Sequence, residues 1–163
     1  MKADTLLTHI HKIEGWLTDH EAVLLFLLAQ HAPAQGEIVE VGSWKGKSTV
    51  CLALGAKLSR KPGNVWAVDP HKGTIVADKT KDYPATFTDF LKTLKTNHVE
   101  DIVTPVKKTS VEAAKSWRKP IRLLFVDGLH DYAHAREDFL SWSPLVTPNG
   151  IIAFHDGFCG EKG

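Results

Sequence analysis

The stretch EIVEVGSWKGKST, residues 37–49, joins a predicted strand, a glycine-containing turn and the start of a predicted helix. Residues 38–41 are apolar apart from Glu40, which is typical of a short strand buried in a sheet. Residues 48–59 place apolar side chains on one helical face. The glycines allow a ligand to approach the backbone closely, and the free N–H groups at the helix start are suited to hold it. We therefore expect a strand–turn–helix unit with a ligand-binding loop.

The same alternation of strand and helix continues along the chain. This order predicts right-handed crossovers and an α/β fold with a doubly wound, mostly parallel sheet that helices cover on both faces. Pro105 lies inside one strand and cannot donate a backbone hydrogen bond, so that strand is expected at a sheet edge. The predicted strands are 38–41, 64–69, 102–106, 121–127 and 151–154, the helices between them are 48–59, 86–96, 109–117 and 133–142, and residues 147–150 form a predicted turn.

Two helices are predicted before the first strand. Asp4 can cap a first helix with apolar residues on a single face. Thr18 and Glu21 have the spacing of a capping box, which opens a second helix. That helix is nearly all apolar and is therefore expected to lie buried against a larger element. We expect residues 1–35 to form an N-terminal helical segment packed on a domain formed by residues 36–163.

The composition predicts one soluble domain. The chain has 163 residues, 43% hydrophobic and 24% charged residues, and a formal net charge of +1. This charge balance gives no reason to expect nucleic acid as a partner. The most apolar run, residues 22–29, is too short to span a membrane, and the first residues lack the apolar run of a signal peptide, so a cytoplasmic protein is expected.

Three kinds of ligand could use the glycine loop of residues 42–48. A nucleoside triphosphate loop has four residues between its glycines, but only three separate Gly42 from Gly46. The dinucleotide pattern Gly-x-Gly-x-x-Gly is absent, because Ser43-Trp44 follows Gly42. S-adenosylmethionine (SAM) has no phosphate and fits the pattern Glu40-x-Gly42-x-x-x-Gly46 best. A tight turn without any ligand would also explain the two glycines, so the loop alone does not decide.

The ends of the next two strands favour a nucleoside ligand. Asp69 ends the second strand, 27 positions after Gly42, where an acid accepts hydrogen bonds from ribose hydroxyls. Thr109 and Ser110 follow the third strand and are expected at the adenine edge, and Thr109 is equally well placed to cap a helix. The predicted cofactor-binding residues are Glu40, Gly42, Ser43, Trp44, Gly46, Ser48, Asp69, Thr109, Ser110 and Asp127.

Four motifs lie in order at the predicted strand ends. They are residues 40–48, Val68-Asp69, FVDGLHDY at 125–132 and TPNGIIAFHD at 147–156. Together they resemble the class I SAM-dependent methyltransferases, and most closely the small-domain group with Asp-Gly-x-His-x-Tyr and His-Asp signatures. The resemblance covers about residues 37–156. It implies a Rossmann-like fold with strand order 3-2-1-4-5, SAM as the cofactor and S-adenosylhomocysteine (SAH) as the product.

A terminal hairpin of strands 6 and 7 normally completes the sheet of this family. Only residues 157–163 follow the fifth predicted strand and its His-Asp signature, too few for that hairpin. We therefore expect either a fragment that lacks the last strands or a sheet edge that a partner chain covers, as in a homodimer.

The resemblance also implies an activity, methyl transfer to a small-molecule acceptor, with oxygen as the expected acceptor atom. Asp127 and Asp156 correspond to aspartates that hold a divalent cation in similar metal-dependent O-methyltransferases, which implies a site for Mg²⁺. Without a metal, His130 or His155 is the expected general base, because histidine titrates near neutral pH. The predicted catalytic residues are Asp127, His130 and His155. Two alternatives stay open: a nucleotide-binding module similar to P-loop proteins, and a non-catalytic α/β domain that binds adenosyl compounds.

Overall fold

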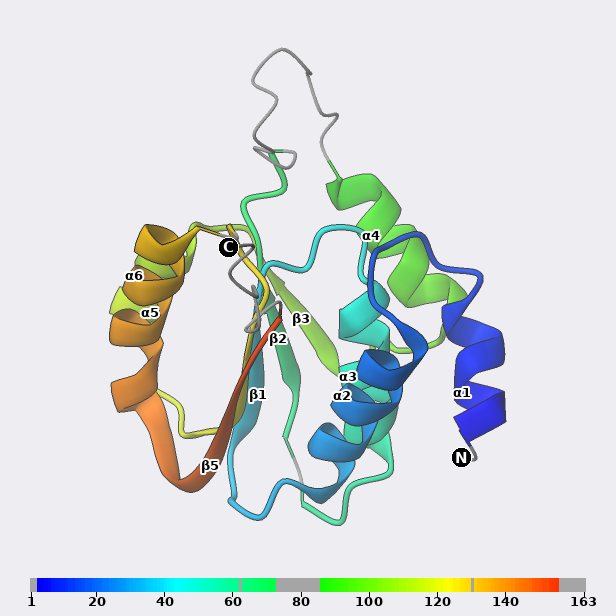
Figure 1. The fold of residues 1–163 in the computed structure, drawn as a ribbon, viewed down its shortest axis with the longest axis horizontal. Coiled ribbons are helices and arrows are strands. Elements are labelled where there is room, and N and C mark those ends of the chain that lie inside the picture. Colours follow the sequence, from blue (N-terminus) through cyan, green and yellow to red (C-terminus); the bar gives the residue numbers. More distant parts are fainter. Residues whose placement is uncertain (1–2, 62, 73–85, 130, 156–163) are drawn as a thin grey trace, which may run out of the picture.

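The computed structural model describes residues 3–61, 63–72, 86–129 and 131–155 (Figure 1). Helices and strands alternate from the first strand onward, as the sequence predicts. The elements are α1 (Ala3–Ile10), α2 (Asp19–His31), β1 (Glu37–Val41), α3 (Lys47–Lys57), β2 (Val65–Val68), α4 (Phe87–Thr96), β3 (Val103–Val106), α5 (Ser110–Ser116), β4 (Ile121–Val126), α6 (Tyr132–Trp142), a short 3-10 helix (Ser143–Leu145) and β5 (Val146–Phe154).

The five strands form one parallel sheet in the order β3-β2-β1-β4-β5. This confirms the predicted strand order, with Pro105 on the edge strand β3. β1 lies at the centre, and its last residue, Val41, pairs with Val68 of β2 and Val126 of β4. Since the strands are parallel, their carboxyl ends lie at the same edge of the sheet. The loops that follow β1, β2 and β4 are thereby brought together.

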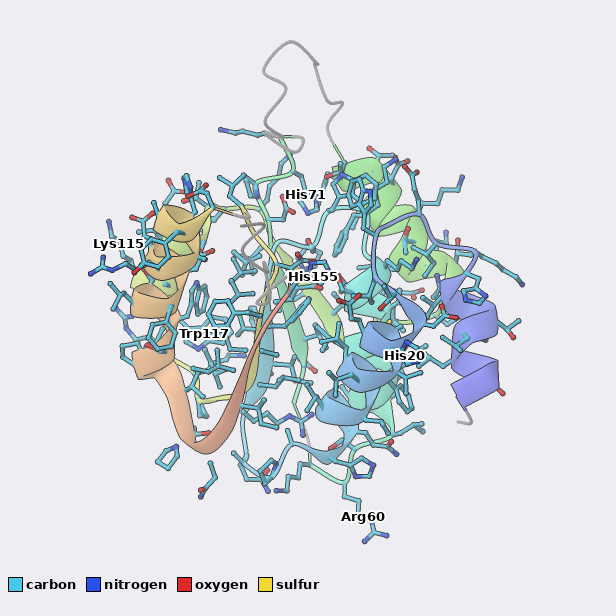
Figure 2. The ribbon with its side chains drawn as sticks, viewed as in Figure 1. His20, Arg60, His71, Lys115, Trp117 and His155 are labelled. Carbon is cyan, nitrogen blue, oxygen red and sulfur yellow. The ribbon has the colours of Figure 1, made fainter. Side chains whose placement is uncertain are left out.

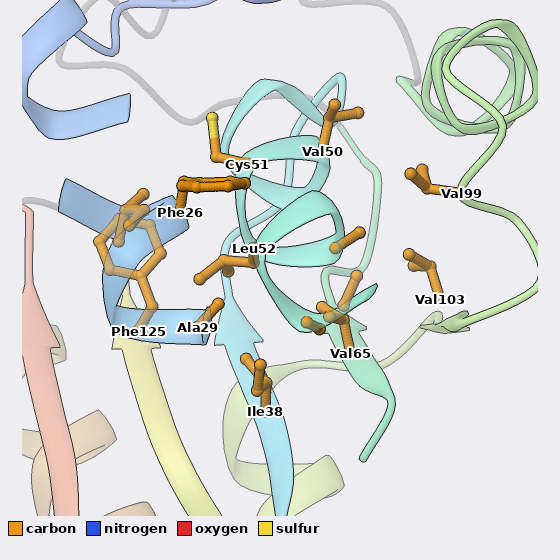
Figure 3. Packing of buried hydrophobic residues seen from close by; sticks show 14 of the residues in the cluster. Phe26, Ala29, Ile38, Val50, Cys51, Leu52, Val65, Val99, Val103 and Phe125 are labelled. Carbon is orange, nitrogen blue, oxygen red and sulfur yellow. The ribbon is translucent and has the colours of Figure 1, made fainter. Parts of the chain in front are cut away.

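Helices cover both faces of the sheet (Figure 1). α5 and α6 pack on one face, in a cluster that includes the fully buried Trp142. α2 and α3 pack on the other face, where Phe26 of α2, Leu52 of α3 and Phe125 of β4 belong to one buried cluster (Figure 3). Successive residues of β1 point to opposite faces of the sheet. Ile38 belongs to the cluster with α2 and α3, and Val39 belongs to the cluster with α5 and α6.

The predicted N-terminal capping box of α2 is present. The Thr18 hydroxyl accepts a hydrogen bond from the Glu21 backbone N–H, and the Glu21 carboxylate accepts one from the Thr18 N–H at 2.8 Å. The expectation that this nearly all-apolar helix lies buried is wrong for its outer side. Leu24 is 54% exposed and Leu27 is 42% exposed, because α3 covers only the side that carries Phe26.

Residues 147–150 lie within β5 instead of forming a turn before it. Val146 already pairs with Ile121 of β4, and the regular register resumes where Ile151 pairs with Leu123. The intervening residues form an irregular bulge in which Asn149 has a φ of 64°. The turn-forming residues are therefore used inside the strand. Among the described residues, the sheet ends at β5.

None of the helices in the described part of the chain is long and apolar enough to cross a membrane.

The close contact between α2 and α3 depends on Gly55. A Cβ atom at Gly55 would lie 2.2 Å from the Phe26 carbonyl oxygen. We predict that Gly55→Ala lowers the free energy of unfolding by about 3 kcal/mol, because the two helix backbones must separate to admit the methyl group. Urea unfolding followed by circular dichroism measures this change. A variant as stable as the wild-type protein would show that the helices do not approach this closely.

Candidate functional site

A cavity of about 860 Å³ opens at the carboxyl ends of the strands. Its walls come from the loops after β1, β2 and β4, from the N-terminal residues of α5, and from the chain that enters α2. Eight of the ten predicted cofactor-binding residues line it: Gly42, Ser43, Trp44, Ser48, Asp69, Thr109, Ser110 and Asp127. The fold thus brings together residues that lie up to 85 positions apart, from Gly42 to Asp127.

Gly42 fixes the course of the loop after β1. Its φ is 87°, and a Cβ atom there would lie 2.1 Å from the carbonyl oxygen of Asp127. Only glycine fits this close approach between the ends of β1 and β4. The other predicted glycine, Gly46, has a φ of 91° and is the residue before α3. It faces the Phe90 ring and is not among the residues that line the cavity.

The Asp69 carboxylate holds the loop after β1. One of its oxygens accepts hydrogen bonds from the backbone N–H groups of Ser43 at 3.0 Å and Trp44 at 2.9 Å. The other oxygen accepts the N–H of His71 at 2.6 Å. A carboxylate has about four lone-pair positions, so Asp69 retains capacity for a further donor from the cavity. Sequence reasoning assigned Asp69 to ligand binding and missed its contacts with the loop.

Glu40 lies beneath the first turn of α3 and is not among the residues that line the cavity. Its side chain is fully buried, and its carboxylate accepts a hydrogen bond from the Thr49 hydroxyl. Burial raises the pKa of Glu40 to about 8, against the opposing effect of hydrogen bonds from Ser48 and Thr49. The binding role of Glu40 stays a prediction, and its effect on a ligand would act through the loop after β1.

His155 lies between two carboxylates at the edge of the cavity. Its Nδ1 atom is 3.1 Å from Oδ1 of Asp127 at the end of β4, and its Nε2 atom is 3.5 Å from Oε1 of Glu21 at the start of α2. The His155 side chain is only 10% exposed, near the ends of the strands (Figure 2). The backbone N–H of His155 donates to the Val126 carbonyl, which fixes the position of the residue beside β4.

Two predicted site residues, His130 and Asp156, lie outside the described residues. Among the residues described, no group of three or more His, Cys, Asp or Glu side chains is arranged to hold a metal ion. The predicted Mg²⁺ site therefore gains no support from the described side chains.

The chain between α1 and α2 is a wall of the cavity that sequence reasoning missed. The Lys45 ammonium bonds to Glu14 at 2.8 Å, and the Lys47 ammonium donates to the Gly15 carbonyl at 3.1 Å. The Trp16 ring lies 4.6 Å from the Trp44 ring between centroids. These contacts fasten residues 14–16 to the glycine loop. We call this arrangement the N-terminal clasp.

Glu21 and Asp138 also line the cavity without having been predicted as site residues. Glu21 was recognised only as part of a capping box, since its spacing from Thr18 explains it fully. The capping box correctly places the start of α2, but the direction of that helix relative to the sheet is a tertiary property.

The sequence matches a family described as "Methyltransferase domain" over residues 39–157. Among curated proteins, it is 26% identical over 141 residues to the uncharacterized protein y4gI of Sinorhizobium fredii. That match spans 82% of this chain but only 14% of the much longer relative.

Solved structures with a similar fold include two in complex with SAH. One is the SAH-bound methyltransferase PaMTH1 of Podospora anserina, with a TM-score of 0.69 and 18% identity, covering 94% of this chain and 62% of that one. Another is the O-methyltransferase of Bacillus cereus in complex with SAH, with a TM-score of 0.65 and 19% identity, covering 92% of this chain and 63% of that one. At these identities the likeness establishes the fold. The chain spans less than two thirds of the length of each.

The raised pKa of Glu40 predicts a pH-dependent stability. The folded protein keeps the Glu40 proton up to about pH 8, whereas the unfolded chain releases it near the usual value of 4.5. The stability from this group is therefore present below pH 4.5 and is lost as the pH rises through 8. We expect Glu40→Gln to remove a slope of about 1 kcal/mol per pH unit between these values.

The measurement is urea unfolding of both proteins at several pH values from 5 to 8.5. The amide introduced by Glu40→Gln would still offer an oxygen to the Thr49 hydroxyl, so the hydrogen bond is kept and only the titration is removed. Thr49→Val, which removes the hydroxyl and keeps the acid, should retain a pH slope. Parallel slopes in the wild-type protein and Glu40→Gln would contradict the assigned shift.

Proposed function

This chain belongs to the methyltransferase-domain family, and on that premise we propose that it transfers the methyl group of SAM to an oxygen atom of a small-molecule acceptor. The observation that carries the proposal is the family match over residues 39–157, which includes the loop that Asp69 holds and most of the residues that line the cavity beside it. The cavity volume of about 860 Å³ lies in the usual range for small-molecule sites.

We assign the cofactor to the side of the cavity formed by the ends of β1, β2 and β3. The loop of residues 42–44 would face the amino-acid part of SAM, and Asp69 would accept hydrogen bonds from its ribose. Thr109 and Ser110 would lie beside the adenine. The sulfonium and its methyl group would then lie toward Asp127 and the acceptor.

His155 is proposed as the base that removes the acceptor proton. Methyl transfer is an in-line displacement: the acceptor oxygen forms a bond to the methyl carbon as the carbon–sulfur bond breaks, and the hydroxyl proton must leave. Asp127, at 3.1 Å from Nδ1, is placed to orient the imidazole. His130 remains a proposed catalytic residue whose position is outside the described residues.

The proposed mechanism needs no divalent cation. Asp127 already contacts His155, and the described side chains supply no group of three ligands around it. The role of Mg²⁺ therefore stays a prediction that depends on Asp156. Methyl transfer that continues in the presence of EDTA would show that the reaction needs no divalent cation.

We propose that residues 36–163 form the catalytic domain, with residues 1–35 as a helical segment packed on it, and that the protein acts in the cytoplasm. A homodimer through the β5 edge is the proposed partner arrangement. Analytical ultracentrifugation would test it.

The identity of the cofactor can be tested by thermal denaturation with separate ligands. We expect SAM and SAH at 1 mM to raise the melting temperature by several degrees, because a ligand that binds only the folded state stabilises it. ATP and NAD should cause little change. Stabilisation by ATP, but by neither adenosyl compound, would overturn the proposal in favour of a nucleotide-binding module.

The role of Asp69 needs two substitutions, because the carboxylate also holds the loop. Asp69→Asn keeps an oxygen for the N–H groups of Ser43 and Trp44 but removes the charge. We expect it to weaken SAH binding about tenfold, with a smaller loss of stability than Asp69→Ala. Isothermal titration calorimetry and urea unfolding measure the two effects. Unchanged SAH affinity in Asp69→Asn would argue against a ribose contact.

A further inference from the structure

Asp138 is a buried carboxylate in the wall of the cavity. It lies on α6, is only 6% exposed, and lines the cavity together with Ser110 and Gly128. The Ser110 side chain makes a hydrogen bond to Asp138, and the Ser110 oxygen accepts one from the Trp142 indole at 2.9 Å. Two helices therefore fix this carboxylate.

Gly128 lets Asp138 approach the end of β4. A Cβ atom at Gly128 would lie 3.1 Å from Oδ2 of Asp138, which is tighter than an ordinary contact. The glycine that follows Asp127 thus leaves room for the carboxylate on the cavity side of the loop. This placement on three elements is rigid enough for a selective contact with a ligand.

Within the described part of the chain, the Asp138 carboxylate has unused hydrogen-bonding capacity. Burial raises the pKa of Asp138, and the Ser110 hydroxyl opposes this effect. One hydroxyl occupies one of about four acceptor positions. Burying a carboxylate is costly unless donors compensate it, so a donor from a bound ligand would stabilise Asp138 in this wall.

The proposed binding mode of SAM places such a donor nearby. With the ribose at Asp69, the adenine lies toward Thr109 and Ser110, the residue to which Asp138 is bonded. Pro70 and Val111, which follow Asp69 and Ser110 in the chain, also line the cavity and offer apolar surfaces to the faces of a ring. The donor on the edge of adenine is its exocyclic 6-amino group.

We propose that the Asp138 carboxylate accepts a hydrogen bond from the 6-amino group of the cofactor's adenine and thereby rejects a cofactor with an oxo group at that position. This inference rests on the proposed function. It adds a residue that determines base specificity, from a helix for which the sequence patterns indicate no binding role.

The test compares SAH with S-inosylhomocysteine, in which an oxo group replaces the 6-amino group, by isothermal titration calorimetry. The wild-type protein should bind SAH about 10- to 100-fold more tightly than S-inosylhomocysteine. The oxo group and the Asp138 carboxylate are both hydrogen-bond acceptors, so no hydrogen bond can form between them. Asp138→Asn should lose or reverse this preference, since the amide N–H₂ can donate to the oxo group. A purely structural role for Asp138 would not reverse the preference.

Glu137→Gln is the matched control, because Glu137 is an exposed neighbour on α6 that also lines the cavity. It should keep the wild-type preference. If Asp138→Asn does not fold, Asp138→Ser removes the charge with a smaller side chain and should also lose the preference.

The outcomes separate the inference from the function on which it rests. Equal wild-type affinity for the two ligands, or a variant that weakens both equally and keeps the preference, would overturn the role of Asp138 and leave SAH binding intact. Failure of the wild-type protein to bind SAH at all would instead overturn the proposed function.

Discussion

The hydrogen bonds from Ser43 and Trp44 to the Asp69 carboxylate join the ends of the neighbouring strands β1 and β2. Without them, the loop after β1 would have to satisfy its N–H groups elsewhere, and its open shape would not be specified. The same carboxylate faces the cavity. Loop structure and the proposed ribose contact therefore depend on one side chain, which limits the substitutions that Asp69 can accept.

Close packing around the central strand β1 also holds the loop after β1 in place. Gly42 admits the Asp127 carbonyl to a distance that no other residue allows, and the buried Glu40 receives the Thr49 hydroxyl from α3. Residues at the end of β1 thus fix the position of the end of β4 and the start of α3. A binding loop built on such a strand has little freedom to rearrange, which suits a site that must hold a reactive group in line with its acceptor.

Local signals account for the parts of the fold that the sequence predicts well. The capping boxes at Thr18 and Thr109 depend on residues three positions apart, and the strand order follows from the alternation of elements together with the resemblance. The bulge in β5 was predicted as a turn, because residues 147–150 have turn chemistry and only pairing with β4 reveals the strand.

The sequence predicts which residues line the cavity best where the residue follows the end of a strand, as Asp69 does. Glu21 and Asp138 lie on helices, and their positions beside His155 and Ser110 depend on how those helices cross the sheet. No spacing within the sequence encodes that crossing.

The N-terminal clasp has a consequence for how this unit can be reused in longer proteins. Lys45 and Lys47 of the glycine loop are held by Glu14 and Gly15, which precede the region that the family shares. A gene fusion that transferred only the shared region would leave both ammonium groups without these partners and would expose the Trp44 ring. A fusion that is to keep these contacts must therefore include the chain from residue 14 onward, well before the region that the family shares.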